Sequence, residues 1–238
     1  MRPRIFVSST FYDLKYIRED LANFIKLYDF ESILFEDGDI GYTPGKKLDD
    51  SCYEQMRAAD MVILIIGGAY GSAASNEKED DFQEYMSVTR REFQIAISES
   101  IPVFAFIDMD VYVEYGLYEY NYEDIENKHQ NLKFKATKNI NVFRFIREIK
   151  GIGNISITEF KKTGEIKEFL RKQWADMFKS YLRILKENGS DKKIISTVGE
   201  MNDLIKRMDT MLDGIGKKIL GNGEKIQYGD VVQQIEID

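Results

Sequence analysis

The sequence has no long apolar run, and it contains a single cysteine. No stretch of about 18 consecutive apolar residues occurs, so no transmembrane helix is predicted. Cys52 alone excludes an internal disulfide and indicates a reducing compartment. The first residues, MRPRIFVSST, lead into a strand-like run without the apolar segment of a secretory signal. We therefore expect a cytoplasmic protein that does not bind membranes.

Several common catalytic chemistries lack the residues that they need. The one histidine, His129, lies in the polar segment NKHQN, which disfavours a Ser–His or Cys–His pair. No Cys/His cluster has the spacing of a zinc site, and no Asp/Glu pattern matches an EF-hand. The segment GDIGYTPGKK does not have the spacing of a P-loop. We predict no metal and no resident cofactor, and we exclude a P-loop NTPase.

The charge is uneven along the chain. The net charge is -8, yet residues 1–158 carry 18 basic and 27 acidic groups, whereas residues 159–220 carry 14 basic and 10 acidic groups. A basic helical segment fits a nucleic acid, an acidic partner or simply a solvated helix face. Because no nucleic-acid motif or dense Lys/Arg block accompanies it, nucleic acid is not an expected partner.

Apolar strand-like runs alternate with helical patterns over the first 160 residues. These runs are apolar throughout, which is typical of parallel strands buried on both faces. The spacing of apolar residues predicts helices between the strands. Right-handed crossovers then give a flavodoxin-like, doubly wound α/β fold with strand order 2-1-3-4-5. The expected strands are 4–8, 32–36, 61–67, 103–108 and 155–160, and the expected helices are 13–28, 49–59 and one that contains Glu92.

Three parts are expected along the chain. Residues 1–160 form the α/β domain, residues 161–221 form a helical hairpin or coiled-coil segment, and residues 222–238 form a short tail. The second part has apolar residues at alternating steps of four and three, which is a heptad seam: Ile194, Val198, Met201, Ile205, Met208, Leu212, Ile215 and Ile219. This seam pairs either with the preceding helix or with a second copy of the chain.

A Tyr-rich insertion occupies about residues 109–150 of the first part. Its tyrosines are Tyr112, Tyr115, Tyr118, Tyr120 and Tyr122. Three interpretations are open: a specificity pocket, a protein interface, or a small satellite core.

A doubly wound sheet binds ligands beyond the carboxyl ends of its strands, where the strand order reverses. With order 2-1-3-4-5 this crevice lies between the first and third strands. Polar and glycine residues lie at both of its walls: Ser8, Ser9, Thr10, Gly67, Gly68 and Tyr70. Hydroxyl and backbone N–H groups there suit a ribose or a phosphate. They also have a structural interpretation, because Ser, Thr and Asp13 are good helix caps and Gly-Gly is an ordinary turn.

Glu92 begins its helix at the same edge and shares an apolar stripe with Val88 and Ala96. The segment TRRE fits a capping box, in which Thr89 caps the helix and Glu92 reaches back to the N–H of Thr89. Alternatively, an ionised carboxylate beside a sugar stabilises the cation formed in glycosidic cleavage. The helix dipole would favour the ionised form. The local pattern by itself favours the capping box, although one carboxylate can serve both roles.

Three segments resemble a TIR-like domain of unknown function that precedes NACHT and related STAND NTPases. They are RIFVSSTFYDLKYIREDLANFI, SCYEQMRAADMVILIIGGAYGS and SVTRREFQIAI, within roughly residues 3–108. More distantly, the chain is similar to TIR domains and nucleoside 2-deoxyribosyltransferases, which share the flavodoxin-like architecture. In the NAD-cleaving members an essential Glu begins the helix after the third strand, and Glu92 falls at that position. The loop at 37–47 matches the TIR loop used for self-association and gating.

The resemblance implies an N-glycosidase that cleaves the nicotinamide–ribose bond of NAD, by hydrolysis or cyclisation, in bacterial antiphage defence. Glu92 would stabilise the cation at the anomeric carbon, and Tyr70 would stack on a base. The first-strand hydroxyls would contact ribose or phosphate, with Asp13 as the acidic residue that follows them. The resemblance also implies a homo-oligomer and a partner effector or sensor protein.

Two other functions remain open. One is a non-catalytic TIR-like module that acts through self-assembly, and the other is a deoxyribosyltransferase-like enzyme that acts on nucleosides or nucleotides. The sequence also departs from the TIR pattern, because the Trp-Cys pair common before the catalytic helix is absent and no NTPase module follows.

Overall fold

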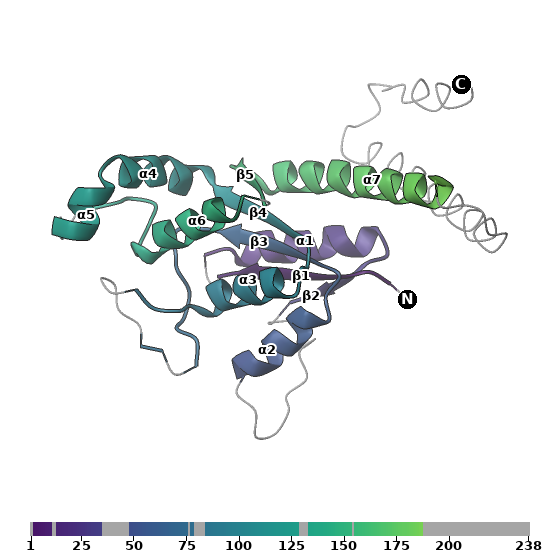
Figure 1. The fold of residues 1–238 in the computed structure, drawn as a ribbon, viewed down its shortest axis with the longest axis horizontal. Helices are drawn as coiled ribbons and strands as arrows, with labels where there is room; N and C mark the ends of the chain where they lie inside the picture. The colour runs from purple at the N-terminus through teal and green to yellow at the C-terminus, as the bar shows by residue number, and fades with distance from the viewer. Residues whose placement is uncertain are drawn as a thin grey trace. The chain divides into compact units, whose positions relative to one another are not determined.

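The fold is built on a five-stranded sheet, seen in a computed structural model that describes residues 2–10, 13–34, 48–75, 77–78, 84–128, 133–153 and 155–187 (Figure 1). The strands are β1 (Arg4–Ser9), β2 (Glu31–Ile33), β3 (Met61–Ile66), β4 (Val103–Asp108) and β5 (Ser156–Phe160). All pairs are parallel, in the order β2-β1-β3-β4-β5. The predicted doubly wound fold class and strand order are therefore confirmed.

The continuous apolar character of the central strands β1, β3 and β4 follows from burial on both faces of the sheet. Every residue of β3 is buried. Because successive side chains point to opposite faces, Phe6 and Val62 lie on the face that packs against α2 and α3. On the other face, the rings of Phe104 and Phe106 pack edge-on against Phe169 of α7. The central strands are therefore apolar along their length, and their polar residues lie at the strand ends.

Seven helices flank the sheet in the described part of the chain: α1 (Lys15–Leu27), α2 (Leu48–Arg57), α3 (Val88–Ser98), α4 (Met109–Tyr120), α5 (Tyr122–Lys128), α6 (Asn141–Ile152) and α7 (Thr163–Glu187). Figure 1 shows α2 and α3 on the same side of the sheet, with α4, α5 and α6 gathered at the left end. None of the helices in the described ranges has the length and hydropathy needed to cross a bilayer.

The Tyr-rich insertion folds as α4, α5 and the greater part of α6. Asp108 begins this region as the N-cap of α4, where its carboxylate accepts a hydrogen bond from the N–H of Asp110 at 2.9 Å. Tyr115 and Tyr118 are buried in a core that also includes Phe93 of α3. Tyr120, by contrast, is 89% exposed. The tyrosine core is thus continuous with the core under α3 and is not a separate satellite.

Element boundaries differ from the sequence expectations mainly at strand and helix ends. The second strand has three residues, and α1 begins at Lys15 with Leu14 as its N-cap. The chain divides into two compact units, Met1–Trp174 and Ala175–Asp238. The heptad seam at 194–219, the tail at 222–238 and the loop at 37–47 lie outside the described residues.

The chain between β3 and α3 leaves and returns at neighbouring points. Gly71 adopts a φ of 88°, a left-handed conformation that glycine accepts without steric cost. Beyond it, Ala73 and Ser87 form an antiparallel bridge, and the N–H of Ala74 donates to the carbonyl of Met86 at 2.8 Å. These contacts hold the two ends of the segment together, so that α3 begins beside the carboxyl end of β3.

Candidate active site

Ser8 and Glu92, 84 positions apart in sequence, meet at the carboxyl end of β1. The hydroxyl of Ser8 donates to Oε2 of Glu92 at 2.6 Å. Both side chains are buried, with exposed fractions of 1% and 6%. Ser8 reaches α3 because it points to the same face of β1 as Phe6, which packs under α3. The structure thus brings together two residues that the sequence placed at one crevice.

The capping-box interpretation of Glu92 is wrong. Ser87 is the N-cap of α3, and its hydroxyl accepts a hydrogen bond from the N–H of Arg90 at 3.2 Å. Thr89 is therefore the second residue of the helix and Glu92 the fifth, beyond the third position that a capping-box carboxylate occupies. The sequence SVTRRE offers two candidate caps, and the earlier one is used. Glu92 faces β1 because of the helix stripe, not because of capping.

Ser9 points to the opposite face of β1 and contacts Arg18. Nη1 of Arg18 donates to Oγ of Ser9 at 2.8 Å and to the carbonyl of Val7 at 3.0 Å. Arg18 is 3% exposed. Arg18 was not predicted as a site residue, although it lies in the apolar stripe of α1 four residues after Leu14, the same pattern that indicates Glu92.

Asp13 connects the β1 wall of the crevice to the β3 wall. The hydroxyl of Thr10 donates to Oδ1 of Asp13, and the N–H of Ala69 donates to its Oδ2 at 3.2 Å. A Cβ atom added to Gly67 would lie 2.7 Å from Oδ2, so glycine leaves the space that this carboxylate fills. Since α1 has Leu14 as its N-cap, without a side-chain cap bond, the predicted capping role of Asp13 is not observed.

Gly68 and Tyr70 lie against other parts of the chain. The backbone carbonyl of Ala136 packs so closely on Gly68 that a Cβ atom there would overlap it. Tyr70 is 4% exposed, its ring packs edge-on against Tyr85, and its hydroxyl donates to the carbonyl of Tyr85 at 2.8 Å. Stacking of Tyr70 on a ligand base stays a prediction, and it requires this ring to be uncovered.

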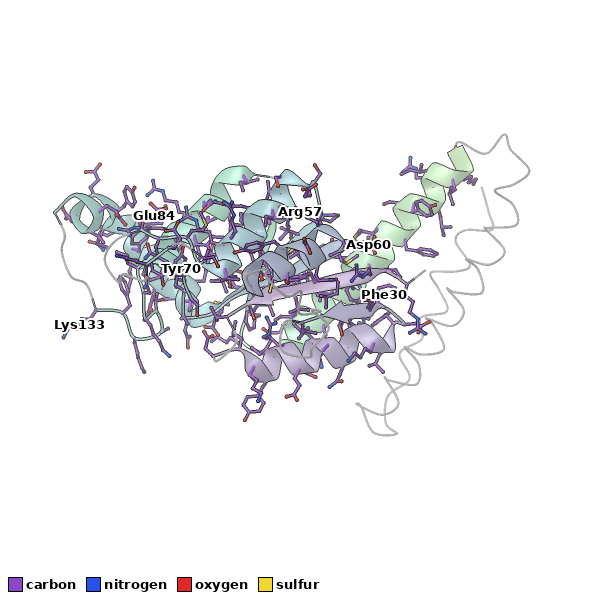
Figure 2. The ribbon with its side chains drawn as sticks, turned by 90° about the horizontal axis from the view of Figure 1, so that it is seen from below. Phe30, Arg57, Asp60, Tyr70, Glu84 and Lys133 are labelled. Carbon is purple, nitrogen blue, oxygen red and sulfur yellow. The ribbon has the colours of Figure 1, made fainter. Side chains whose placement is uncertain are left out.

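Arg90, two residues before Glu92, holds the start of α3 in place. It donates to Glu148 at 2.5 Å, to Glu84 at 2.6 Å and to the hydroxyl of Tyr70 at 3.4 Å. Burial alone would lower the pKa of Arg90, but the hydrogen bonds with Tyr70 and Glu84 outweigh it and raise the pKa. The permanently charged Arg90 thereby joins α3, α6 and the segment before α3. Tyr70 and Glu84 are both labelled at the left end of the molecule in Figure 2.

Glu114 of α4 was also missed by the sequence reasoning. Its Oε1 accepts hydrogen bonds from the N–H groups of Lys135 and Ala136 at 2.7 and 2.8 Å, and its Oε2 accepts one from Thr137 at 2.8 Å. Burial alone would raise the pKa of Glu114, but the three amides stabilise the carboxylate and lower it. No sequence pattern indicates this contact, since it joins residues more than 20 positions apart.

A small cavity, with room on the scale of one water molecule, lies among the carboxyl ends of β1 and β3, the start of α3 and α6. It is lined by Thr10, Ile65, Ile66, Ala69, Tyr70, Thr89, Val142 and Phe145. The lining joins both crevice walls to the first turn of α3.

Two of the solved structures that resemble this chain illustrate how distant the likeness is. The CMP N-glycosidase of Clostridium botulinum is 15% identical, with 71% of this chain and 98% of that chain covered and a TM-score of 0.38. A conserved protein from Enterococcus faecalis V583 is 13% identical, with 73% and 99% covered and a TM-score of 0.42. At these values neither structure bears on the activity of this chain. No curated protein matches it in sequence.

The comparison with protein families, unlike that with solved structures, identifies a family that matches most of the chain. The family described as Domain of unknown function (DUF4062) matches residues 4–175. The matched range includes every strand, the Ser8–Glu92 contact and the Glu114 contacts. The chain therefore belongs to the DUF4062 family.

Proposed function

We propose that this protein is an N-glycosidase that cleaves the bond between a base and the ribose of a nucleotide, with Glu92 as its catalytic carboxylate. The observation that carries the proposal is the buried contact of 2.6 Å between Ser8 and Glu92 at the point where the strand order reverses. Ligands of doubly wound sheets bind at this point. The contact is not explained by helix capping, since Ser87 caps α3.

The chemistry follows from the properties of a fixed carboxylate. As the C–N bond breaks, its electron pair leaves with the base, and positive charge develops on the anomeric carbon and ring oxygen. A carboxylate held near this centre stabilises the charge without having to reorganise. Water then adds to the anomeric carbon and releases one proton to solvent through Glu92. The hydrogen bond from Ser8 to Oε2 fixes the plane of the carboxylate.

NAD is the substrate that we propose, with nicotinamide as the leaving base and a linear or cyclic product. The support is the residue-level resemblance to NAD-cleaving TIR domains. On the same basis we propose a role in antiphage defence, with activation by self-assembly through the α/β domain or the heptad segment and with a partner effector or sensor. Sizing of the full-length protein at increasing concentration tests assembly, and a monomer at every concentration would contradict it.

A second candidate is a non-catalytic interaction module. The Ser8–Glu92 contact is compatible with this candidate, because it joins β1 to α3 and stabilises the fold whether or not a ligand binds. The two functions differ in what happens when the negative charge is removed while the size of the side chain is kept.

The decisive experiment compares wild type with Glu92→Gln and Ser8→Ala. Purified full-length protein is incubated at high concentration with NAD and with a panel of nucleosides and nucleotides, and released base is measured by chromatography. Glu92→Gln is expected to lower the rate on the order of 100-fold, and Ser8→Ala roughly tenfold. Glu99→Gln is the matched control, because Glu99 is the C-cap at the other end of α3 and its side chain forms an exposed ion pair with Arg57.

The outcomes separate the two candidates. Equal activity of Glu92→Gln and wild type would remove Glu92 from the catalytic site. Release of no base from any compound by folded wild type would favour the interaction module. Global unfolding of Glu92→Gln, seen as a lost thermal transition, would assign the contact to stability.

A further inference from the structure

The segment at 133–138 lies against Gly68 at the β3 wall of the candidate site, and Glu114 binds its backbone. Glu114 accepts hydrogen bonds from three successive backbone N–H groups, those of residues 135, 136 and 137, all within 2.8 Å. Three amide donors on one carboxylate make a short and strong set of charge-assisted bonds. Glu114 therefore fixes the backbone of this segment and not merely one side chain.

The other side of the segment contacts the end of β3. The N–H of Lys138 donates to the carbonyl of Gly68 at 2.8 Å. The carbonyl of Ala136 packs on the Cα of Gly68, where any side chain would overlap it. The absence of a side chain at Gly68 is what allows this close approach.

Gly68 is followed directly by the residue that closes the crevice wall. The N–H of Ala69 donates to Asp13, and Asp13 in turn accepts a hydrogen bond from Thr10 at the end of β1. A continuous series of contacts thus runs from Glu114 through residues 135–138 to Gly68, and from Ala69 to the β1 wall.

We propose that Glu114 is a positioning residue, which holds residues 135–138 against Gly68 and thereby sets the spacing between the β3 and β1 walls of the crevice. The inference rests on the proposed function only for its effect on substrate. Its structural part, the coupling of Glu114 to Gly68 and Ala69, stands independently. Glu114 itself touches neither Glu92 nor the reacting bond in this proposal.

Glu114→Gln is the sharpest variant. Gln keeps the shape of the side chain, but it replaces one acceptor oxygen by an NH₂ group, which would face a backbone N–H and repel it. Gly68→Ala disturbs the same contact from the other side, because its Cβ would force the carbonyl of Ala136 away. Glu123→Gln is the matched control, since Glu123 is an exposed carboxylate on the neighbouring helix α5.

The test is hydrogen–deuterium exchange on the full-length protein without substrate. In Glu114→Gln and in Gly68→Ala, the amides of residues 135–138 and of Ala69 are expected to exchange at least about tenfold faster, which is 1.4 kcal/mol of lost protection. The amides of β4 are expected to keep their wild-type rates, which distinguishes local opening from global unfolding. Glu123→Gln is expected to match wild type throughout.

The kinetic counterpart is a several-fold increase in KM with a smaller change in kcat, because the crevice wall binds substrate and Glu92 performs the chemistry. Faster exchange confined to residues 135–137, with Ala69 protected as in wild type, would overturn the proposal. So would an unchanged KM in a variant whose Ala69 amide is exposed. If wild type cleaves no compound, the proposed function fails, and the exchange experiment still decides the role of Glu114.

Discussion

At the amino ends of the strands a guanidinium binds a carboxylate and a neutral acceptor, whereas at the carboxyl ends two carboxylates accept hydrogen bonds from hydroxyl and N–H groups. At the amino edge, Arg4 donates to Glu31 at 3.2 Å and to Gln55 at 2.8 Å, and its own N–H donates to Asp60 at 2.7 Å. At the carboxyl edge, Glu92 accepts from Ser8, and Asp13 accepts from Thr10 and Ala69. In Figure 2 Asp60 is labelled to the right of the strands and Tyr70 to their left.

The difference separates a structural network from a candidate site within one sheet. A guanidinium that bridges two strands neutralises the charge beside it and fixes the register of β1 and β2, which pair at Arg4 and Glu31. At the carboxyl edge Glu92 accepts a hydrogen bond from a neutral hydroxyl, and in the proposed reaction an ionised carboxylate there would stabilise a cationic transition state. The cation at the carboxyl edge, Arg18, donates instead to backbone carbonyls and to Ser9.

The largest expected effect is on stability, when Arg18 at the carboxyl edge and Arg4 at the amino edge are each replaced. Arg18 is buried, whereas Arg4 is partly exposed. Arg18→Met is expected to lower the free energy of unfolding by about 3 kcal/mol, because it removes a buried cation that donates to the carbonyl of Val7 and to the hydroxyl of Ser9. Arg4→Met is expected to cost about 1 kcal/mol, since its side chain is 28% exposed and water replaces its bonds. Urea denaturation of both variants measures the difference, and equal losses would contradict it.

An intermediate effect is expected from a double-mutant cycle at the carboxyl edge. The free energies of unfolding of Ser8→Ala, Glu92→Gln and the double variant should give a coupling energy of about 1.5 kcal/mol, as for a hydrogen bond to a charged group. This cycle measures the contact itself and is independent of activity. A coupling energy within error of zero would show that the two side chains do not interact in solution.

Much of this architecture is predictable from periodicity. The apolar runs identify the central strands β1, β3 and β4, because a strand buried on both faces needs apolar residues at nearly every position. The edge strands β2 and β5 are less buried and carry a weaker signal. The same reasoning places Ser8, Thr10, Asp13 and Glu92 at one edge, since parallel strands end together.

What the sequence does not predict depends on contacts between distant residues. Two hydroxyl residues precede Arg90, and the choice of Ser87 over Thr89 as cap follows from the bridge that places Ser87 opposite Ala73. Glu114 binds backbone N–H groups, which nearly every residue carries, so no residue type in the sequence indicates its partners. Arg18 was predictable in principle, because a charged residue on an apolar stripe has to find buried acceptors.

The smallest expected effect is a pH dependence of stability in the Tyr-rich insertion. Like Arg4 and Glu31 at the amino edge, Arg144 and Glu126 form an ion pair there. Arg144 donates to both oxygens of Glu126, at 2.9 and 2.7 Å. These bonds lower the pKa of Glu126 below its ordinary value of 4.5, against the opposing effect of burial, and the hydroxyl of Tyr118 also lowers it.

Because the folded-state pKa lies below the unfolded one, the stabilisation is present above pH 4.5 and is lost as the pH falls through the folded-state value. Glu126→Gln should therefore show a shallower loss of unfolding free energy between neutral pH and about pH 3 than wild type. Denaturant titrations across this range measure the slope. An identical slope in wild type and variant would show that Glu126 does not contribute.

The bridge between Ala73 and Ser87 has a practical consequence for engineering. Since the chain leaves and re-enters the fold at neighbouring points, the ends of any sequence inserted between Ala74 and Met86 are already held together by the hydrogen bond between those two residues. The entropy of closing a loop grows only with the logarithm of its length, by about 0.6 kcal/mol for each doubling. We therefore expect a reporter domain inserted at this position to cost little stability.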